Sequence, residues 1–161
     1  MNKYKQRFKR WLVRRISSSR SADKFSRLTR EGLADVEAGR VFDHHVVQVW
    51  ADSLNADSAL STPLPQSALM WSSRAVLDLM QLYQFLSVWS PPSAAQTVQK
   101  LTAAPIALLG NPTLGECLSE SGSKDIRRVP VGHYEIVYQR MGSSLCLLRV
   151  RHLREYRYHD H

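Results

Sequence analysis

Two stretches decide the fold of this chain: Asp125-Ile-Arg-Arg-Val-Pro-Val-Gly-His-Tyr-Glu-Ile-Val-Tyr-Gln139 and, a short way downstream, Leu147-Leu-Arg-Val-Arg-His-Leu-Arg-Glu155. Both are rich in β-branched and aromatic residues at alternating positions, and short polar turns separate them, as is typical of a β-meander. Three strands are expected, at residues 126–131, 134–140 and 145–150. The sequence therefore predicts an antiparallel meander that ends in a basic tail.

The segment before the meander has the pattern of one short strand and two helices. Residues 68–71 suit a strand, and Ser72 or Ser73 can cap a helix that runs to about residue 88. Two prolines after Ser90 are compatible with the first turn of a second helix. Pro105 should kink or end that helix, although the apolar pattern continues to residue 109.

The first of these two helices is apolar nearly all round, which predicts burial on more than one side. Arg74, Asp78 and Gln81 are expected to mark its solvated face. Together, these elements predict a small α+β domain of about 95 residues: a strand, two helices and a three-stranded antiparallel meander, preceded by a helical N-terminal extension.

Residues 69–157 resemble the RelE/ParE superfamily of bacterial toxins through four motifs in the same order. Met70-Trp-Ser-Ser-Arg-Ala-Val-Leu-Asp-Leu79 resembles the family's opening strand and first helix, and residues 105–116 its helix-to-loop motif. Residues 127–138 match Arg-x-x-x-Val-Gly-x-Tyr-x-Ile-x-Tyr, and residues 149–154 match the closing Arg-Val-x-His-x-Arg. The resemblance implies the family fold and a toxin of a type II toxin-antitoxin system.

Two activities exist within that superfamily, and the resemblance leaves both open. RelE-type members cut messenger RNA on the ribosome with basic residues that stabilise the developing phosphorane charge. Here the catalytic residues would be Arg128, His152 and Arg154, but Glu135 stands where an arginine is expected and would repel the phosphate. The closing motif instead resembles ParE-type members, which bind DNA gyrase. The chain is thus not clearly an enzyme; if it is one, it is an endoribonuclease.

Basic residues of the meander and tail are the expected target-binding surface. The resemblance implies that they dock on DNA gyrase or, alternatively, on the ribosome and its messenger RNA. The residues assigned to this surface are Arg127, Arg128, Arg149, Arg151, Arg154 and Arg157.

Charge divides the chain into three parts. Residues 1–30 carry eleven Lys/Arg and one Asp, residues 31–66 one Arg and six acids, and residues 67–161 ten Lys/Arg and seven acids. The predicted organisation is a basic amphipathic arm (1–27), an acidic segment with a Pro-rich linker (28–66) and the toxin-like domain (67–161).

The acidic segment resembles the C-terminal end of a cognate antitoxin. Helices are expected at about 22–38, terminated by Gly39, and at 43–54 with Asp43 as N-cap. An amphipathic helix as short as the second is marginal alone, so we expect it to pack on the downstream domain and neutralise it in cis. The expected contact residues are Val46, Val47, Trp50, Leu54 and Leu64.

Other protein classes have little support. No apolar run reaches the roughly 18 residues that a membrane-spanning helix needs. Two unpaired cysteines favour a reducing, cytoplasmic location. His44 and His45 point apart on a helix, so no metal site is expected, and no cofactor motif is visible.

The hypothesis is therefore a ParE-like toxin domain that inhibits growth by binding DNA gyrase, fused to an antitoxin-like segment. A RelE-like ribosome-dependent endoribonuclease and an inactive fusion that acts only as a binding module are the alternatives. A separate antitoxin partner and a homo-oligomer are left open.

Overall fold

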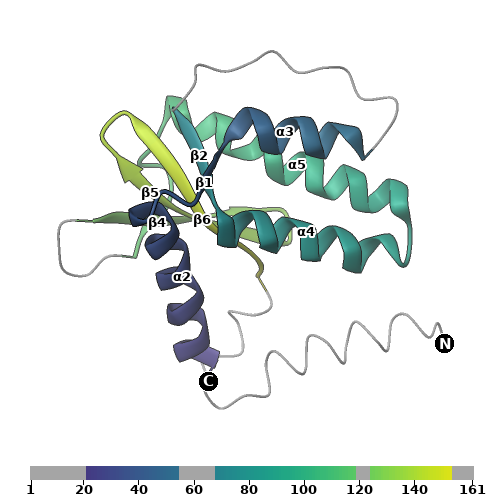
Figure 1. Ribbon diagram of the computed structural model, residues 1–161, viewed down its shortest axis with the longest axis horizontal. Coiled ribbons are helices and arrows are strands. Elements are labelled where there is room, and N and C mark those ends of the chain that lie inside the picture. Colours follow the sequence, from purple (N-terminus) through teal and green to yellow (C-terminus); the bar gives the residue numbers. More distant parts are fainter. Residues whose placement is uncertain (1–20, 55–67, 119–123, 154–161) are drawn as a thin grey trace.

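The computed structural model describes residues 21–54, 68–118 and 124–153, and within them the chain forms an α+β fold around one six-stranded mixed sheet (Figure 1). The strand order is β1-β2-β6-β5-β4-β3. The elements are α2 (Ser21–Glu37), β1 (Val41–Asp43), α3 (His44–Ser53), β2 (Leu69–Ser72), α4 (Ser73–Ser87), α5 (Pro91–Gly110), β3 (Glu116–Cys117), β4 (Asp125–Val131), β5 (Tyr134–Met141) and β6 (Ser144–His152).

The antiparallel meander β4-β5-β6 is confirmed, and it forms one half of the sheet. β2 pairs in parallel with β6, Leu69 opposite Leu145 and Trp71 opposite Leu147. Parallel pairing requires a long crossover, and helices α4 and α5 lie within it.

The sheet is wider than predicted, because β1 and β3 extend it at its two ends. β1 pairs antiparallel with β2, and β3 pairs antiparallel with β4. The sequence shows no sign of either strand, since runs of three and two residues are too short for an alternating pattern.

The helix predictions hold, with small shifts at the ends. Ser72 caps α4, and its side chain accepts a hydrogen bond from the backbone N–H of Ala75 at 3.1 Å. Asp43 caps α3 by accepting from the N–H of His45 at 2.9 Å. Gly39 follows α2 at φ 75°, a conformation that suits glycine. Helix α5 continues through Pro105 instead of ending there.

Helices α4 and α5 pack on each other and on the central strands, and α3 packs on α5 (Figure 1). Apolar side chains from these elements form one core. Its fully buried members include Trp71, Leu79, Val98, Leu101, Ile136, Tyr138 and Leu147. α4 contacts α2, α5 and β6, as its apolar width predicts, but Leu77 and Met80 remain exposed.

Helix α2 approaches β6 closely because Gly32 has no side chain. A Cβ atom at Gly32 would lie 2.6 Å from the carbonyl oxygen of Leu148, nearer than van der Waals contact allows. The contact partner is backbone, which cannot move aside as a flexible side chain would. Glycine at this position therefore sets the distance between α2 and the sheet.

Asp35 of α2 and Arg40, which follows the helix, accept hydrogen bonds from the first turn of α4. The Asp35 carboxylate accepts from the backbone N–H of Arg74 at 2.9 Å and from Arg40 Nε at 2.8 Å. The Arg40 carbonyl accepts from both the backbone N–H (3.1 Å) and the hydroxyl (3.0 Å) of Ser73. The first N–H groups of a helix lack partners within it, so residues from the N-terminal segment complete the start of α4.

Replacing Gly32 with alanine should lower the free energy of unfolding by about 1–3 kcal/mol, the usual cost of overpacking, although alanine favours a helix. Gly110→Ala is the matched control, since a Cβ there meets nothing within 4 Å. It should be neutral or mildly stabilising. Urea unfolding of both variants measures the difference, and equal stability would mean that α2 does not rest on β6 at Gly32.

Candidate target-binding surface

A row of alternating charges crosses four strands of the sheet at the predicted target-binding residues. Glu116 on β3 stands opposite Arg128 on β4, and Glu135 on β5 stands opposite Arg151 on β6. Arg128 Nε donates to Glu116 Oε2 at 2.8 Å and lies 3.5 Å from Glu135 Oε1. Arg151 forms an ion pair with the other oxygen of Glu135. The row contains two cations and two anions, so it has no net charge.

Most charged side chains of this row are largely buried, which strengthens the attraction between them. Only 4 % of Glu135 and 5 % of Arg151 are exposed, and the Arg128 side chain is 14 % exposed. Charges removed from water are stable only when paired. The prediction that Arg151 belongs to an exposed basic surface is therefore wrong for this arrangement, because its guanidinium is turned to Glu135.

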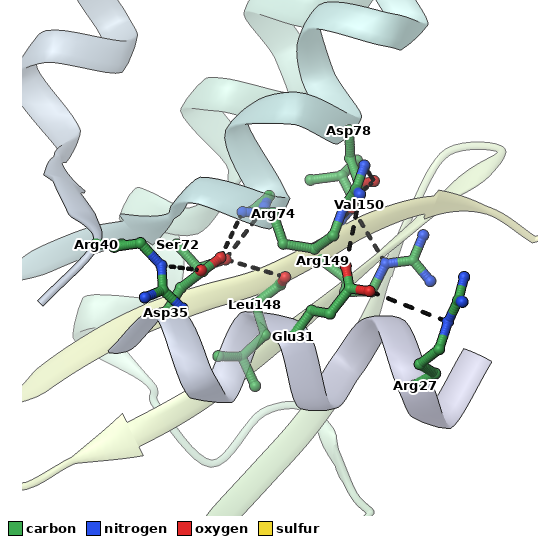
Figure 2. A network of polar contacts seen from close by, with 11 residues as sticks. Arg27, Glu31, Asp35, Arg40, Ser72, Arg74, Asp78, Leu148, Arg149 and Val150 are labelled. Carbon is green, nitrogen blue, oxygen red and sulfur yellow. Dashed lines mark hydrogen bonds and ion pairs between the residues drawn. The ribbon is translucent and has the colours of Figure 1, made fainter. Parts of the chain in front are cut away.

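Arg149 was also assigned to the target-binding surface, but only 2 % of it is exposed. That assignment is therefore wrong as well. Its Nε donates to Asp78 Oδ2 at 3.1 Å, and the backbone N–H of Val150 donates to the same oxygen at 3.1 Å. Arg74 binds the other oxygen of Asp78 through Nε (3.2 Å) and an Nη atom (3.1 Å) (Figure 2). Asp78 is thus buried between two arginines, whereas the sequence pattern placed it on the solvated face of α4.

This buried pair is connected to α2. Figure 2 shows Arg74 between Asp78 on one side and Asp35 on the other. Glu31 lies 3.8 Å from Arg74 and 4.0 Å from Arg27, one turn earlier on α2. Charged contacts therefore run without interruption from α2 through α4 to β6.

Arg127 fastens the loop between α5 and β3. Its Nε donates to Asp125 at 2.8 Å, and an Nη atom donates to the carbonyls of Thr113 (3.2 Å) and Gly115 (3.0 Å). Beside it, the Tyr138 hydroxyl donates to the Pro112 carbonyl at 2.9 Å and accepts from the Gly115 N–H at 3.1 Å. Both side chains hold the loop in place. Tyr138 itself is fully buried.

His152 lies among aromatic rings. Its ring centroid is 5.2 Å from that of Tyr134, edge to face, and 6.4 Å from that of His133, stacked. Burial raises the pKa of Tyr134, which packs against the core. Of the other predicted tail residues, Arg154 and Arg157 lie outside the described residues.

The residues predicted to make the neutralising contact differ in burial, and their neutralising role stays a prediction. Val47 and Ala51 of α3 are buried in the core, and Trp50 and Leu54 pack against it. The Trp50 ring meets Tyr83 edge to face at 6.3 Å, and Gln99 Nε2 donates to the Ala51 carbonyl at 3.2 Å. Val46 is 55 % exposed, so its predicted contact is wrong. Leu64 lies outside the described residues.

Sequence reasoning missed Asp35, Asp78 and His44 as structural partners. His44 is 1 % exposed, and its Nδ1 accepts a hydrogen bond from the Trp71 indole at 3.1 Å. Asp35 and Asp78 stand in helical stretches with no pattern to tell a capping or buried carboxylate from a solvated one. The available sequence signal for Asp78 was its spacing of four residues from Arg74 on one face of the helix, and that pattern favoured exposure.

Within the described ranges, no group of three His, Cys, Asp or Glu side chains could hold a metal ion. None of the helices described is both long and apolar enough to cross a bilayer.

Asp78→Asn should lower the free energy of unfolding by about 3 kcal/mol, because Arg149 is left buried without a counter-charge. Asp125→Asn is the control: this half-exposed carboxylate pairs with Arg127 and Arg140 at 2.8 and 3.8 Å, and its loss should cost at most about 1 kcal/mol. Chemical denaturation of both variants measures the two changes in the free energy of unfolding. If Asp78→Asn were the milder change, Asp78 would not be the counter-ion that stabilises Arg149.

The comparisons with known proteins address the same part of the chain. A search of curated proteins gives no match. Among solved structures, a chain described as the chromosomal ParDE TA system from P. aeruginosa is similar at 22 % identity and a TM-score of 0.45; the match covers 53 % of this chain and 94 % of that one. The family model described as ParE toxin of type II toxin-antitoxin system, parDE, matches residues 69–156. This chain therefore belongs to the ParE toxin family of type II toxin-antitoxin systems.

Proposed function

We propose that this chain is a ParE-type toxin masked in cis by its own antitoxin-like segment, residues 28–66, and that the unmasked domain inhibits growth by binding DNA gyrase. The observation that carries the proposal is that α2, β1 and α3, all upstream of the family match at 69–156, contact four elements of the ParE domain: β2, α4, α5 and β6. A segment that only linked domains would not bury its own apolar residues in the domain that follows.

Each contact closes a surface that the ParE domain would otherwise expose. β1 pairs with the outer edge of β2, and unpaired strand edges invite other chains. Val47 and Ala51 enter the core beside α5. Helix α2 lies on β6, the strand that carries the two buried arginines. This combination of strand, apolar helix and carboxylate contacts supports a neutralising role.

The tether strengthens such a mask. A covalent linker, here residues 55–67, gives a local concentration of the masking segment on the order of millimolar. The mask therefore needs little intrinsic affinity, and it is lost if the segment is displaced or degraded.

The charges of the sheet favour protein binding over RNA cleavage. Glu135 forms ion pairs with both Arg128 and Arg151. Neither guanidinium is therefore available to bind a phosphate in this arrangement. The endoribonuclease alternative would need both side chains to turn away from a buried carboxylate. Docking on gyrase would use the tail residues Arg154 and Arg157.

The test compares two adjacent valines of α3 in the full chain. Val47→Asp places a carboxylate where only 3 % of the native side chain is exposed, and Val46→Asp makes the same change where 55 % is exposed. Val47→Asp should detach α3, arrest growth on expression and inhibit supercoiling by purified gyrase. The wild type and Val46→Asp should do neither. Circular dichroism of Val47→Asp checks that the variant retains its fold.

A second arm releases the segment without changing the core. A protease site inserted between Leu54 and Ala68 allows the purified chain to be cut, and the cut protein should inhibit gyrase once the N-terminal fragment is removed. Messenger RNA cleavage during growth arrest would instead support the endoribonuclease. A folded, unmasked protein that affects neither supercoiling nor translation would support the inactive binding module.

A further inference from the structure

A buried histidine stands at the junction between the masking segment and the ParE domain. His44 is the first residue of α3 and follows β1 directly, and 1 % of it is exposed. Its Nδ1 accepts the indole N–H of Trp71 on β2 at 3.1 Å. The two rings lie nearly parallel, 19° apart with centroids at 6.3 Å. This is the point at which the segment binds the fully buried Trp71 by a polar contact.

The contact requires a neutral imidazole. A tryptophan indole only donates, so His44 Nδ1 must carry a free lone pair and the ring proton must sit on Nε2. Nε2 is itself buried and has no hydrogen-bond partner within the described part of the chain. Protonation would place a second N–H against the indole N–H and a full charge in an apolar site. Both changes oppose the packed state.

Few charges nearby could stabilise an imidazolium. The adjacent Asp43 favours protonation and His45 opposes it. Of the elements packed on α3, β2 has no charged residue, β1 has only Asp43, and α5 has only the exposed Lys100. At the other end of α3 is Asp52. Burial outweighs Asp43, and the pKa of His44 lies below its ordinary value of 6.5.

We propose that His44 is a pH-sensitive latch: protonation of its imidazole breaks the bond to Trp71 and releases β1 and α3 from the ParE domain. The release itself follows from the buried contact. Its consequence, an acid-triggered unmasking of the toxin, rests on the function proposed above.

The pH dependence of α3 attachment follows from the linkage between protonation of His44 and packing. The detached segment binds a proton near pH 6.5 and the packed one only at lower pH, so attachment is full above 6.5 and is lost as the pH falls. Between the two pKa values, the opening equilibrium of α3 should rise about tenfold for each pH unit, the slope for one proton. Below the pKa of the packed state, the slope should vanish.

Nuclear magnetic resonance of the full chain tests the latch. The His44 ring should titrate below pH 6.5, and the Trp71 indole N–H signal should change with the same midpoint. Amide exchange at Val47 and Ala51, corrected for its intrinsic pH dependence, should accelerate over the same range. Exchange in β5 should not follow, because that strand lies beyond the junction.

His44→Asn is the decisive variant, since the asparagine Oδ1 can accept the indole bond but does not titrate. It should abolish the pH dependence of α3 opening, and His45→Asn, at the next position, should preserve it. If His44→Asn fails to fold, the wild-type titration decides alone. A His44 that titrates at or above 6.5, or an α3 that stays protected once His44 is protonated, overturns the proposal. Acid release without gyrase inhibition would leave the latch intact and count against the toxin function.

Discussion

The structure depends on how the half of β6 that β2 does not cover obtains its hydrogen bonds. β6 lies at the centre of the sheet, but its neighbour β2 covers only Leu145 to Leu147 before it ends. Beyond that point, the backbone groups of β6 need other partners, because buried N–H and C=O groups are rarely left unpaired. Ser72 donates to the Leu148 carbonyl, and Asp78 accepts from the Val150 N–H. The pairing of β6 is thus continued by two side chains, one at the end of β2 and one on α4.

The position of Asp78 beside β6 explains the charged residues around that strand. A buried carboxylate needs cations, and Arg149 and Arg74 provide them. Arg74 lies at the first turn of α4, whose N–H groups in turn need acceptors, and Asp35 of α2 is one of them. The acidic segment therefore does more than offset positive charge in general. Its carboxylates make specific bonds, and α2 becomes part of the polar network that completes β6.

Much of this fold could be predicted from the sequence, because its elements carry local signals. Alternation revealed β4, β5 and β6, and Ser72, Asp43 and Gly39 marked helix ends. β1 and β3 were missed because strands so short have no period. Val46 and Val47 were both expected to pack, but adjacent helical residues point about 100° apart, and only Val47 is buried. Arg149 was assigned to the surface because Asp78 is 71 residues away in the chain, beyond any local pattern.

The order of the elements along the chain has a consequence for synthesis. The carboxylate of Asp35, the carbonyl of Arg40 and the apolar face of α3 are all made before β2, and β6 comes last among the strands. Proteins emerge from the ribosome N-terminus first, at several residues per second. The central strand that completes the ParE sheet thus appears only after its cover is available. A nascent chain would therefore complete the ParE sheet with α2, β1 and α3 already synthesised, and would pass through no stage in which the sheet is complete without them.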